Sequence, residues 1–186
     1  MPMRVVVLGA GFGGLELSTM LSEAAGDAVD VTLIDKGDAF VFGFSKLDVM
    51  FGRTTAEAVR LPYRKIAKPG VTVLRETVTA IDPEARRVTT DAGVHDADVL
   101  VIALGADYDM DATPGLAEGG YEYYTLNGAE RMRRALDAFA GGNVLFLCSG
   151  IRSSAPPAPF EGAFLLHERS SVSPFTGRLT RFRPLA

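Results

Sequence analysis

Short apolar runs and a helical repeat alternate along the first 35 residues. The segment RVVVL at residues 4–8 is apolar after its first residue, as expected of a strand that is buried on both faces of a parallel sheet. A second apolar strand, VDVTLID, ends at Asp35. Between them apolar residues recur at helical spacing, at Leu17, Met20, Leu21, Ala24 and Ala25. The pattern predicts a strand–helix–strand unit with a right-handed crossover.

The pattern changes in the middle of the chain. Residues 39–59 are aromatic and glycine-containing without a clear period, and they predict no definite element. A strand is expected at residues 71–76. Short alternating runs follow it, separated by turn signals at Asp82-Pro83 and at residues 91–93, which is typical of an antiparallel meander. The run DVLVIALGA at residues 98–106 predicts another buried strand, ending in glycine.

Two helices and one strand are expected after a loop at residues 106–126. Asn127, with Glu130 three residues later, is a plausible helix start. The apolar residues of this helix are Met132, Ala135, Leu136 and Phe139, and Gly141-Gly142 ends it. NVLFLCSG, which begins at residue 143, predicts a buried strand, and the two prolines before residue 158 introduce a final helix.

The predicted elements indicate an α/β protein with a Rossmann-like dinucleotide-binding domain. We expect this domain at residues 1–110, a linker at 111–126 and the start of a second α/β nucleotide-binding domain at 127–168. Residues 169–186 differ, because they contain four Arg and no acidic residue, whereas residues 1–168 carry 15 basic and 23 acidic residues. We interpret this basic tail as unstructured and without a role in the core.

Composition narrows the possible functions. The 186 residues carry a formal net charge of −4, which disfavours nucleic acid as a partner. Cys148 is the single cysteine, so the chain can form no intramolecular disulfide, which favours a location in the cytoplasm. The only histidines are His95 and His167, and together with one cysteine they are too few for an ordinary zinc site. No apolar stretch approaches the roughly 20 residues that a transmembrane helix needs. Both histidines are expected to be structural or solvated.

The glycines at residues 9–14 form the pattern G-x-G-x-x-G between a predicted strand and a predicted helix. Gly9 permits a tight turn, Gly11 lets the backbone approach a pyrophosphate, and Gly14 lets the helix pack closely on the strand. The pyrophosphate would lie at the helix N-terminus, beside Phe12 and Gly13, where free N–H groups favour an anion. The alternative is that the glycines only make a tight turn.

Asp35 strengthens the dinucleotide interpretation. It ends the second strand 21 residues after Gly14, where a carboxylate can bind both hydroxyls of an adenosine ribose. The same carboxylate would repel the 2′-phosphate of NADP. Lys36 is expected to be a solvated neighbour, although it could lie over the edge of the adenosine.

The segment DADVLVIALGADY favours FAD over NAD. With the glycine pattern it resembles the two-dinucleotide-binding flavoproteins, whose FAD domain has a later strand ending in Ala-Thr-Gly; here these positions are Ala103, Leu104 and Gly105. A plain NAD-binding Rossmann dehydrogenase, which stays as an alternative, would continue with helix–strand repeats where this chain has a meander. The resemblance implies that Val78, Ala103 and Gly105 also contact FAD.

Residues 40–53 and 141–168 resemble the sulfide:quinone oxidoreductase, flavocytochrome c sulfide dehydrogenase and type II NADH dehydrogenase group. The resemblance implies an oxidoreductase that passes electrons from NAD(P)H or a sulfide-like donor through flavin to a quinone-like acceptor. It leaves the catalytic residues and the oligomeric state unknown. Sulfide-oxidising members have a cysteine where this chain has Ala155, and Cys148 alone cannot pass sulfur through a disulfide. Full-length relatives can be membrane-peripheral.

Members of that group are roughly twice as long as this chain. The remaining half would hold the rest of the NADH-side domain, a second flavin-contacting segment and the quinone region. We therefore expect a truncated chain, and the abrupt basic tail is typical of translation in a shifted frame. The alternative function is a dinucleotide-binding remnant that cannot turn over.

Overall fold

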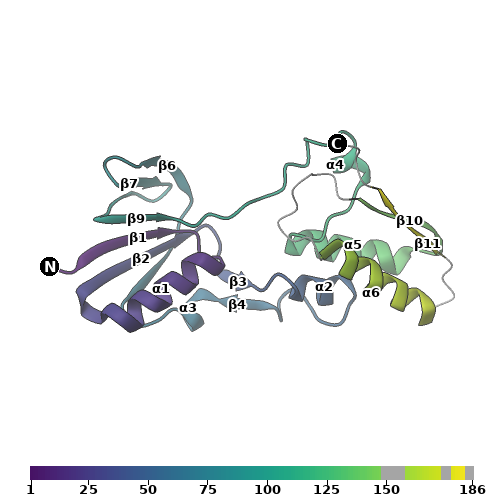
Figure 1. Ribbon diagram of the computed structural model, residues 1–186, viewed down its shortest axis with the longest axis horizontal. Coiled ribbons are helices and arrows are strands. Elements are labelled where there is room, and N and C mark those ends of the chain that lie inside the picture. The colour runs from purple at the N-terminus through teal and green to yellow at the C-terminus, as the bar shows by residue number, and fades with distance from the viewer. Residues whose placement is uncertain (148–157, 173–176, 183–186) are drawn as a thin grey trace. The chain divides into compact units, whose positions relative to one another are not determined.

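The computed structural model describes residues 1–147, 158–172 and 177–182, which form two compact units (Figure 1). The first unit contains residues 1–41 and 60–108, and the second contains residues 42–59 and 109–186. The chain therefore leaves the first unit after Val41, contributes a short segment to the second, and returns at Arg60.

A parallel four-stranded sheet is the centre of the first unit. Its strands lie in the order β5-β2-β1-β9, and each neighbouring pair is parallel. The elements are β1 (Met3–Leu8), α1 (Phe12–Ala25), a 3-10 turn (Gly26–Ala28), β2 (Val29–Asp35), β5 (Val71–Arg75) and β9 (Val99–Ile102). The predicted α/β class and the strand–helix–strand unit are confirmed.

Successive residues of β1 pack on opposite faces of this sheet. Val5 and Val7 join a core with Leu15 and Leu21 of α1, whereas Val6 and Leu8 join a second core with Val88. Figure 1 shows α1 along one face and β7 (Arg87–Thr90), the strand to which Val88 belongs, along the other. Both faces are covered, which explains why the strand is apolar at consecutive positions.

The predicted apolar face of α1 is only partly correct. Leu17 and Leu21 pack against the core, but Met20 is 58% exposed and Ala24 is also exposed. The buried positions of this helix are Gly14 and Ser18, and the Ser18 hydroxyl donates to the carbonyl oxygen of Gly14. Small residues let the helix approach the sheet closely, so the hydrophobic periodicity alone misplaced the buried face by about one position.

The expected meander is a separate three-stranded antiparallel sheet. It consists of β6 (Val78–Asp82), β7 (Arg87–Thr90) and β8 (Val94–Asp96), in that order. Two residues, Glu76 and Thr77, connect it to β5. The short connection holds one end of the meander next to the carboxyl end of the parallel sheet.

Residues 39–59, for which no element is predicted, contain two short elements, and two more follow them directly. In the first unit β3 (Ala39–Val41) pairs antiparallel with β4 (Arg60–Pro62), and α3 (Tyr63–Ile66) follows. In the second unit α2 (Ser45–Met50) supplies a buried cluster that includes Leu47, Val49 and Met50. Elements of three to six residues are too short for a period to identify them.

The rest of the second unit has the two predicted helices and the predicted strand, together with a short helix inside the expected loop and an additional strand. Its elements are α4 (Leu116–Gly119), α5 (Leu126–Ala138), β10 (Gly142–Leu147), α6 (Ala158–Val172) and β11 (Gly177–Phe182). The N-cap of α5 is Thr125, whose hydroxyl accepts from the Gly128 amide, and not Asn127. An N-cap side chain accepts a hydrogen bond from a backbone N–H two or three residues later in the chain, and the Thr125 hydroxyl does so.

The prediction that residues 169–186 lack structure is wrong for much of this segment. Helix α6 continues to Val172, and β11 pairs in parallel with β10 over six residues. The backbone N–H and C=O groups along β10 need hydrogen-bond partners. The backbone of β11 supplies them, and the net positive charge of this segment does not prevent this. Within the described residues, no helix is both long enough and apolar enough to cross a membrane.

Candidate functional site

The loop between β1 and α1 turns at Gly9. This residue has φ of +94°, and a Cβ placed on it would lie 2.4 Å from the carbonyl oxygen of Ala103. Its amide donates to the carbonyl oxygen of Ile34 at 2.8 Å. The turn is thus enclosed by β2 on one side and by the end of β9 on the other, and a side chain at residue 9 is excluded by both backbone angle and space.

Gly14 makes the contact between the helix and this turn. A Cβ at residue 14 would lie 1.8 Å from the carbonyl oxygen of Gly9 and 3.4 Å from the Leu33 side chain. Nothing larger than hydrogen fits there. The requirement for glycine at residues 9 and 14 therefore comes from the protein itself.

Gly11 is different. It is the N-cap of α1 with φ of −77° and ψ of −163°, an extended conformation that any residue adopts. A Cβ on Gly11 would have nothing within 4 Å. No contact in the described part of the chain requires glycine here, which is what is expected of a residue kept small for a bound group.

The start of α1 is open to an anion. The helix begins at Phe12 with no side-chain cap, and its first turn has no acidic residue. The N–H groups of a first helical turn lack partners within the helix and carry the positive end of its dipole. Phe12 is 62% exposed, and its ring contacts Phe40 edge to face at 5.0 Å between centroids. Gly13 is exposed beside it.

Asp35 lies against this loop at the end of β2. Its Oδ2 accepts from the Ala10 amide at 2.7 Å, and its Oδ1 accepts from the Gly37 amide at 2.7 Å. A carboxylate has about four lone-pair positions, so each oxygen keeps room for one more donor. The structure thereby joins two predicted features, the glycine loop and the acid 21 residues beyond it, by one hydrogen bond.

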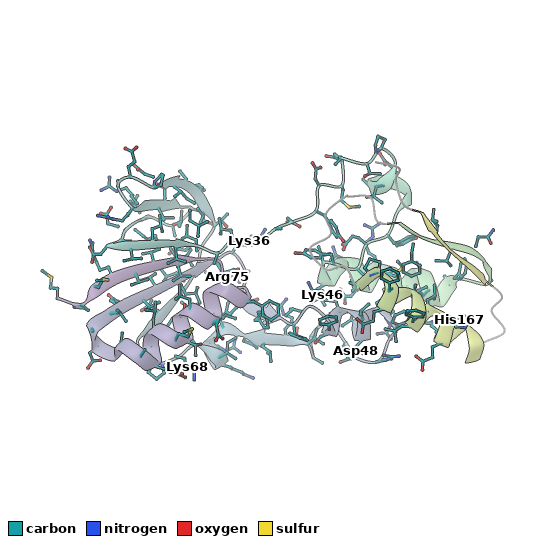
Figure 2. All side chains as sticks on the ribbon, in the orientation of Figure 1. Lys36, Lys46, Asp48, Lys68, Arg75 and His167 are labelled. Atoms are coloured by element: carbon teal, nitrogen blue, oxygen red, sulfur yellow. The ribbon has the colours of Figure 1, made fainter. Side chains whose placement is uncertain are left out.

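Two cationic side chains lie at the same edge of the sheet. Lys36 follows Asp35 directly and is exposed, and Arg75, also exposed, is the register partner of Asp35 on β5 (Figure 2). Figure 2 shows both near the carboxyl end of the parallel sheet. The Lys36 side chain is thus exposed beside Asp35.

The remaining predicted residues come from neighbouring strand ends. Val78 begins β6 and packs beneath the second core, opposite Thr90 of β7. The Ala103 amide donates to the carbonyl oxygen of Leu8, which extends β9 along β1. Gly105 has φ of +75°, and Leu104 between them is 54% exposed. Ala103 therefore lies at the glycine turn.

A polar cluster that the sequence did not identify lies between β5 and the meander. Glu76 Oε2 accepts from the Thr90 hydroxyl at 2.6 Å and lies 2.7 Å from His95 Nε2. These hydrogen bonds hold the pKa of the Glu76 carboxyl below its usual range. The Glu76 amide also donates to the Asp35 carbonyl oxygen at 3.0 Å. His95 is thus a structural residue, and the cluster fixes the meander to the edge that carries Asp35.

The other candidate residues belong to the second unit or lie outside the described residues. His167 is an exposed residue of α6 in the second unit. Cys148 and Ala155, the residues that bear on sulfide chemistry, lie outside the described residues. Among the residues that are described, no group of three or more His, Cys, Asp or Glu could hold a metal ion.

Known proteins resemble this chain in sequence. An NADH dehydrogenase-like protein of Mycobacterium tuberculosis is 37% identical over 147 residues, covering 75% of this chain and 36% of the relative. A type II NADH:quinone oxidoreductase of Staphylococcus epidermidis is 34% identical over 140 residues, covering 74% and 35%. The chain thus spans little more than a third of these relatives.

Comparisons with solved structures and with a family profile indicate the same group of proteins. The sulfide:quinone oxidoreductase of Aquifex aeolicus superposes with a TM-score of 0.81 at 28% identity, over 91% of this chain and 40% of that one. The NDH2 of Plasmodium falciparum, 19% identical with a TM-score of 0.63, covers 78% and 34% and shows a shared fold. Residues 3–150 match the profile of the pyridine nucleotide-disulphide oxidoreductases. The chain belongs to the pyridine nucleotide-disulphide oxidoreductase family.

Proposed function

We propose that this chain binds FAD at the glycine loop and Asp35, and that it supplies the FAD-binding part of an oxidoreductase. The observation that carries the proposal is Gly11. Its missing side chain is required by nothing in the described part of the chain, and it lies at the uncapped start of α1. A dinucleotide pyrophosphate at this helix terminus accounts for both facts.

The residues at the loop suit two parts of the cofactor, the pyrophosphate and the adenosine ribose. Gly9 and Gly14 shape the turn, and the amides of Gly11, Phe12 and Gly13 supply donors to the pyrophosphate. Asp35, already fixed by the amides of Ala10 and Gly37, accepts from the adenosine ribose. Its negative charge disfavours a 2′-phosphate at this position.

Residues at the strand ends complete the proposed contacts with FAD. Val78 presents its backbone at the start of β6, Ala103 presents its backbone just after the carboxyl end of β9, and Gly105 leaves space beyond it. When bound, FAD supplies the electron chemistry through its isoalloxazine ring. The residues of this chain bind and orient the cofactor.

The family supports FAD in particular, because its type II NADH:quinone oxidoreductase and sulfide:quinone oxidoreductase members are flavoproteins. The relatives named above favour NADH as the electron donor and a quinone as the acceptor. Donor and acceptor are part of the proposal, because the chain spans only about a third of those relatives. A sulfide-like donor is the alternative.

The test is reconstitution of the purified 186-residue chain with FAD. We expect the gel-filtered protein to retain the visible absorption of bound flavin, and an excess of NAD to leave that absorption in place. Protein that stays colourless after incubation with FAD, or that releases flavin when NAD is added, would contradict FAD binding. Anaerobic addition of NADH to the yellow protein then tests the donor, because bleaching reports reduction of the flavin.

A further inference from the structure

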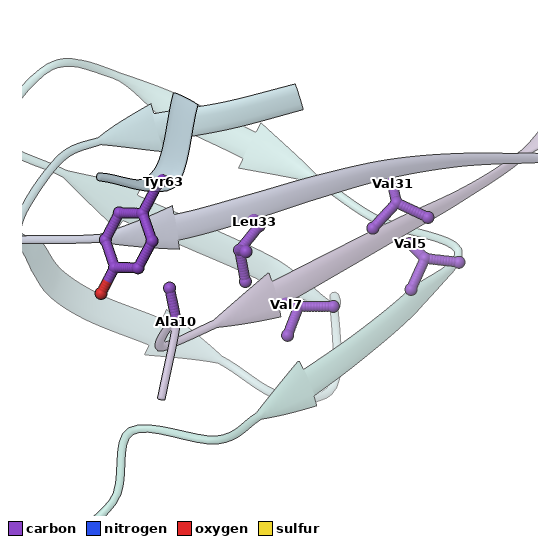
Figure 3. Close-up of a cluster of buried hydrophobic side chains, with 6 residues drawn as sticks. All are labelled: Val5, Val7, Ala10, Val31, Leu33 and Tyr63. Atoms are coloured by element: carbon purple, nitrogen blue, oxygen red, sulfur yellow. The ribbon is translucent and has the colours of Figure 1, made fainter. Parts of the chain in front are cut away.

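Tyr63 lies at the same sheet edge as Asp35, and no pattern in the sequence identifies it. Strand β4 ends at Pro62, and Tyr63 begins α3 with its amide donating to the carbonyl oxygen of Asp38 at 3.0 Å. Figure 3 shows its ring at the carboxyl end of the parallel sheet, with the hydroxyl pointing away from Val5 and Val31. The residue is only 6% exposed.

The ring of Tyr63 packs against the glycine loop. It shares a buried cluster with Ala10 and Leu33 (Figure 3), and Ala10 is the residue whose amide binds the Asp35 carboxylate. The Tyr63 ring therefore supports the part of the loop that holds Asp35. A phenylalanine ring would fill this space equally well.

The hydroxyl of Tyr63 has no such structural role. It makes no hydrogen bond to any residue in the described part of the chain. No fully buried side-chain oxygen or nitrogen there lacks a partner, so the hydroxyl reaches solvent. A ring that is buried and a hydroxyl that is open at a ligand edge are typical of a tyrosine that binds a ligand.

The surroundings keep this hydroxyl protonated. Burial of the ring, followed by the negative charges of Asp35 and Asp38, raises the pKa of Tyr63 to about 12. At neutral pH the group is therefore a hydrogen-bond donor and not a phenolate. A neutral donor near the Asp35 carboxylate suits a ligand that is rich in oxygen atoms. The carboxylate would accept hydrogen bonds from hydroxyls of the ligand, and Tyr63 would donate to another of its oxygens.

We propose that the Tyr63 hydroxyl donates a hydrogen bond to an oxygen of the ADP half of the bound cofactor, beside Asp35. The proposal rests on the proposed FAD binding and adds a binding residue from the β4–α3 connection. It gives the Tyr63 hydroxyl a role in ligand binding, in addition to the packing role of the ring.

The test compares Tyr63→Phe with the wild-type chain by titration calorimetry, using FAD and ADP as ligands. Phenylalanine keeps the ring and removes only the hydroxyl, so we expect the thermal midpoint without ligand to stay the same. Loss of one hydrogen bond between neutral groups should weaken both ligands about three- to tenfold. Tyr121→Phe, at a tyrosine that is 52% exposed in the second unit, serves as the matched control and should leave both affinities unchanged.

The outcomes separate this proposal from the proposed function. Wild-type affinities in Tyr63→Phe, with the wild type binding FAD and ADP, would overturn the role of the hydroxyl and leave FAD binding intact. A wild-type chain that binds neither ligand would overturn both proposals. Weaker FAD binding with unchanged ADP binding would also overturn the assignment, because it would place the contact outside the ADP half.

Discussion

The carboxylate of Asp35 and the backbone amide of Ala10 are joined by a hydrogen bond of 2.7 Å. Ala10 is fully buried, so its amide has no access to water and depends on this acceptor. The bond links the end of β2 to the glycine loop before any ligand is present. The acid that would hold the ribose and the loop that would hold the pyrophosphate are therefore positioned by each other.

Replacing Asp35 with Ala should weaken both the fold and cofactor binding. The buried Ala10 amide would lose its acceptor, which costs about 1–3 kcal/mol of unfolding free energy. Loss of charged hydrogen bonds to the ribose should weaken FAD by roughly tenfold or more per bond. Urea unfolding and FAD titration measure the two effects. Asp30→Ala, at an exposed acid on the same strand, should change neither by a comparable amount, and equal effects of the two variants would contradict the role of Asp35.

Replacing Gly14 with Ala should disrupt the loop. The added Cβ would lie 1.8 Å from the Gly9 carbonyl oxygen, and neither backbone can move without separating α1 from the sheet. Overpacking of this kind costs about 1–3 kcal/mol or more. Gly93→Ala, where an added Cβ meets nothing within 4 Å, is the matched control. If thermal unfolding gave the same midpoint for both variants, the packing described for Gly14 would be incorrect.

The contact between Glu76 and His95 should contribute measurably to stability. Their side chains are only 14% and 22% exposed, and the two atoms lie 2.7 Å apart. A double-mutant cycle with Glu76→Gln and His95→Ala should give a coupling free energy on the order of 1 kcal/mol. Chemical unfolding at pH 7 provides the four values. A coupling within error of zero would show that the two residues act independently.

Arg4 and Asp98 should make stability depend on pH in acid. Hydrogen bonds from the Arg4 side chain and amide lower the pKa of Asp98 to about 2. A carboxyl whose pKa is lower in the folded than in the unfolded state stabilises the fold above the unfolded value, and this contribution is lost as the pH falls toward 2. Asp98→Asn should therefore be less stable than the wild type at pH 5, and the difference should shrink as the pH is lowered. A constant difference would contradict the pair.

The sequence predicted those parts of the site that depend on local rules. Consecutive apolar residues in β1 follow from a sheet covered on both faces, and the glycine spacing with Asp35 follows from backbone geometry. Contacts between distant segments could not be predicted in this way. Tyr63 reaches the loop only because β3 and β4 pair, and Glu76 meets His95 only because the meander folds back. Strand β11 exists because β10 offers a free edge, which no property of residues 177–182 reveals.

The most direct test of FAD binding at the glycine loop is the affinity of Gly11→Ala for FAD. An added Cβ at Gly11 meets nothing within 4 Å, and its backbone angles suit alanine, so thermal unfolding without ligand should stay close to that of the wild type. The same methyl group would occupy the space of the pyrophosphate. We predict a folded protein whose FAD affinity falls at least tenfold. A folded Gly11→Ala variant that binds FAD as tightly as the wild type would contradict the account.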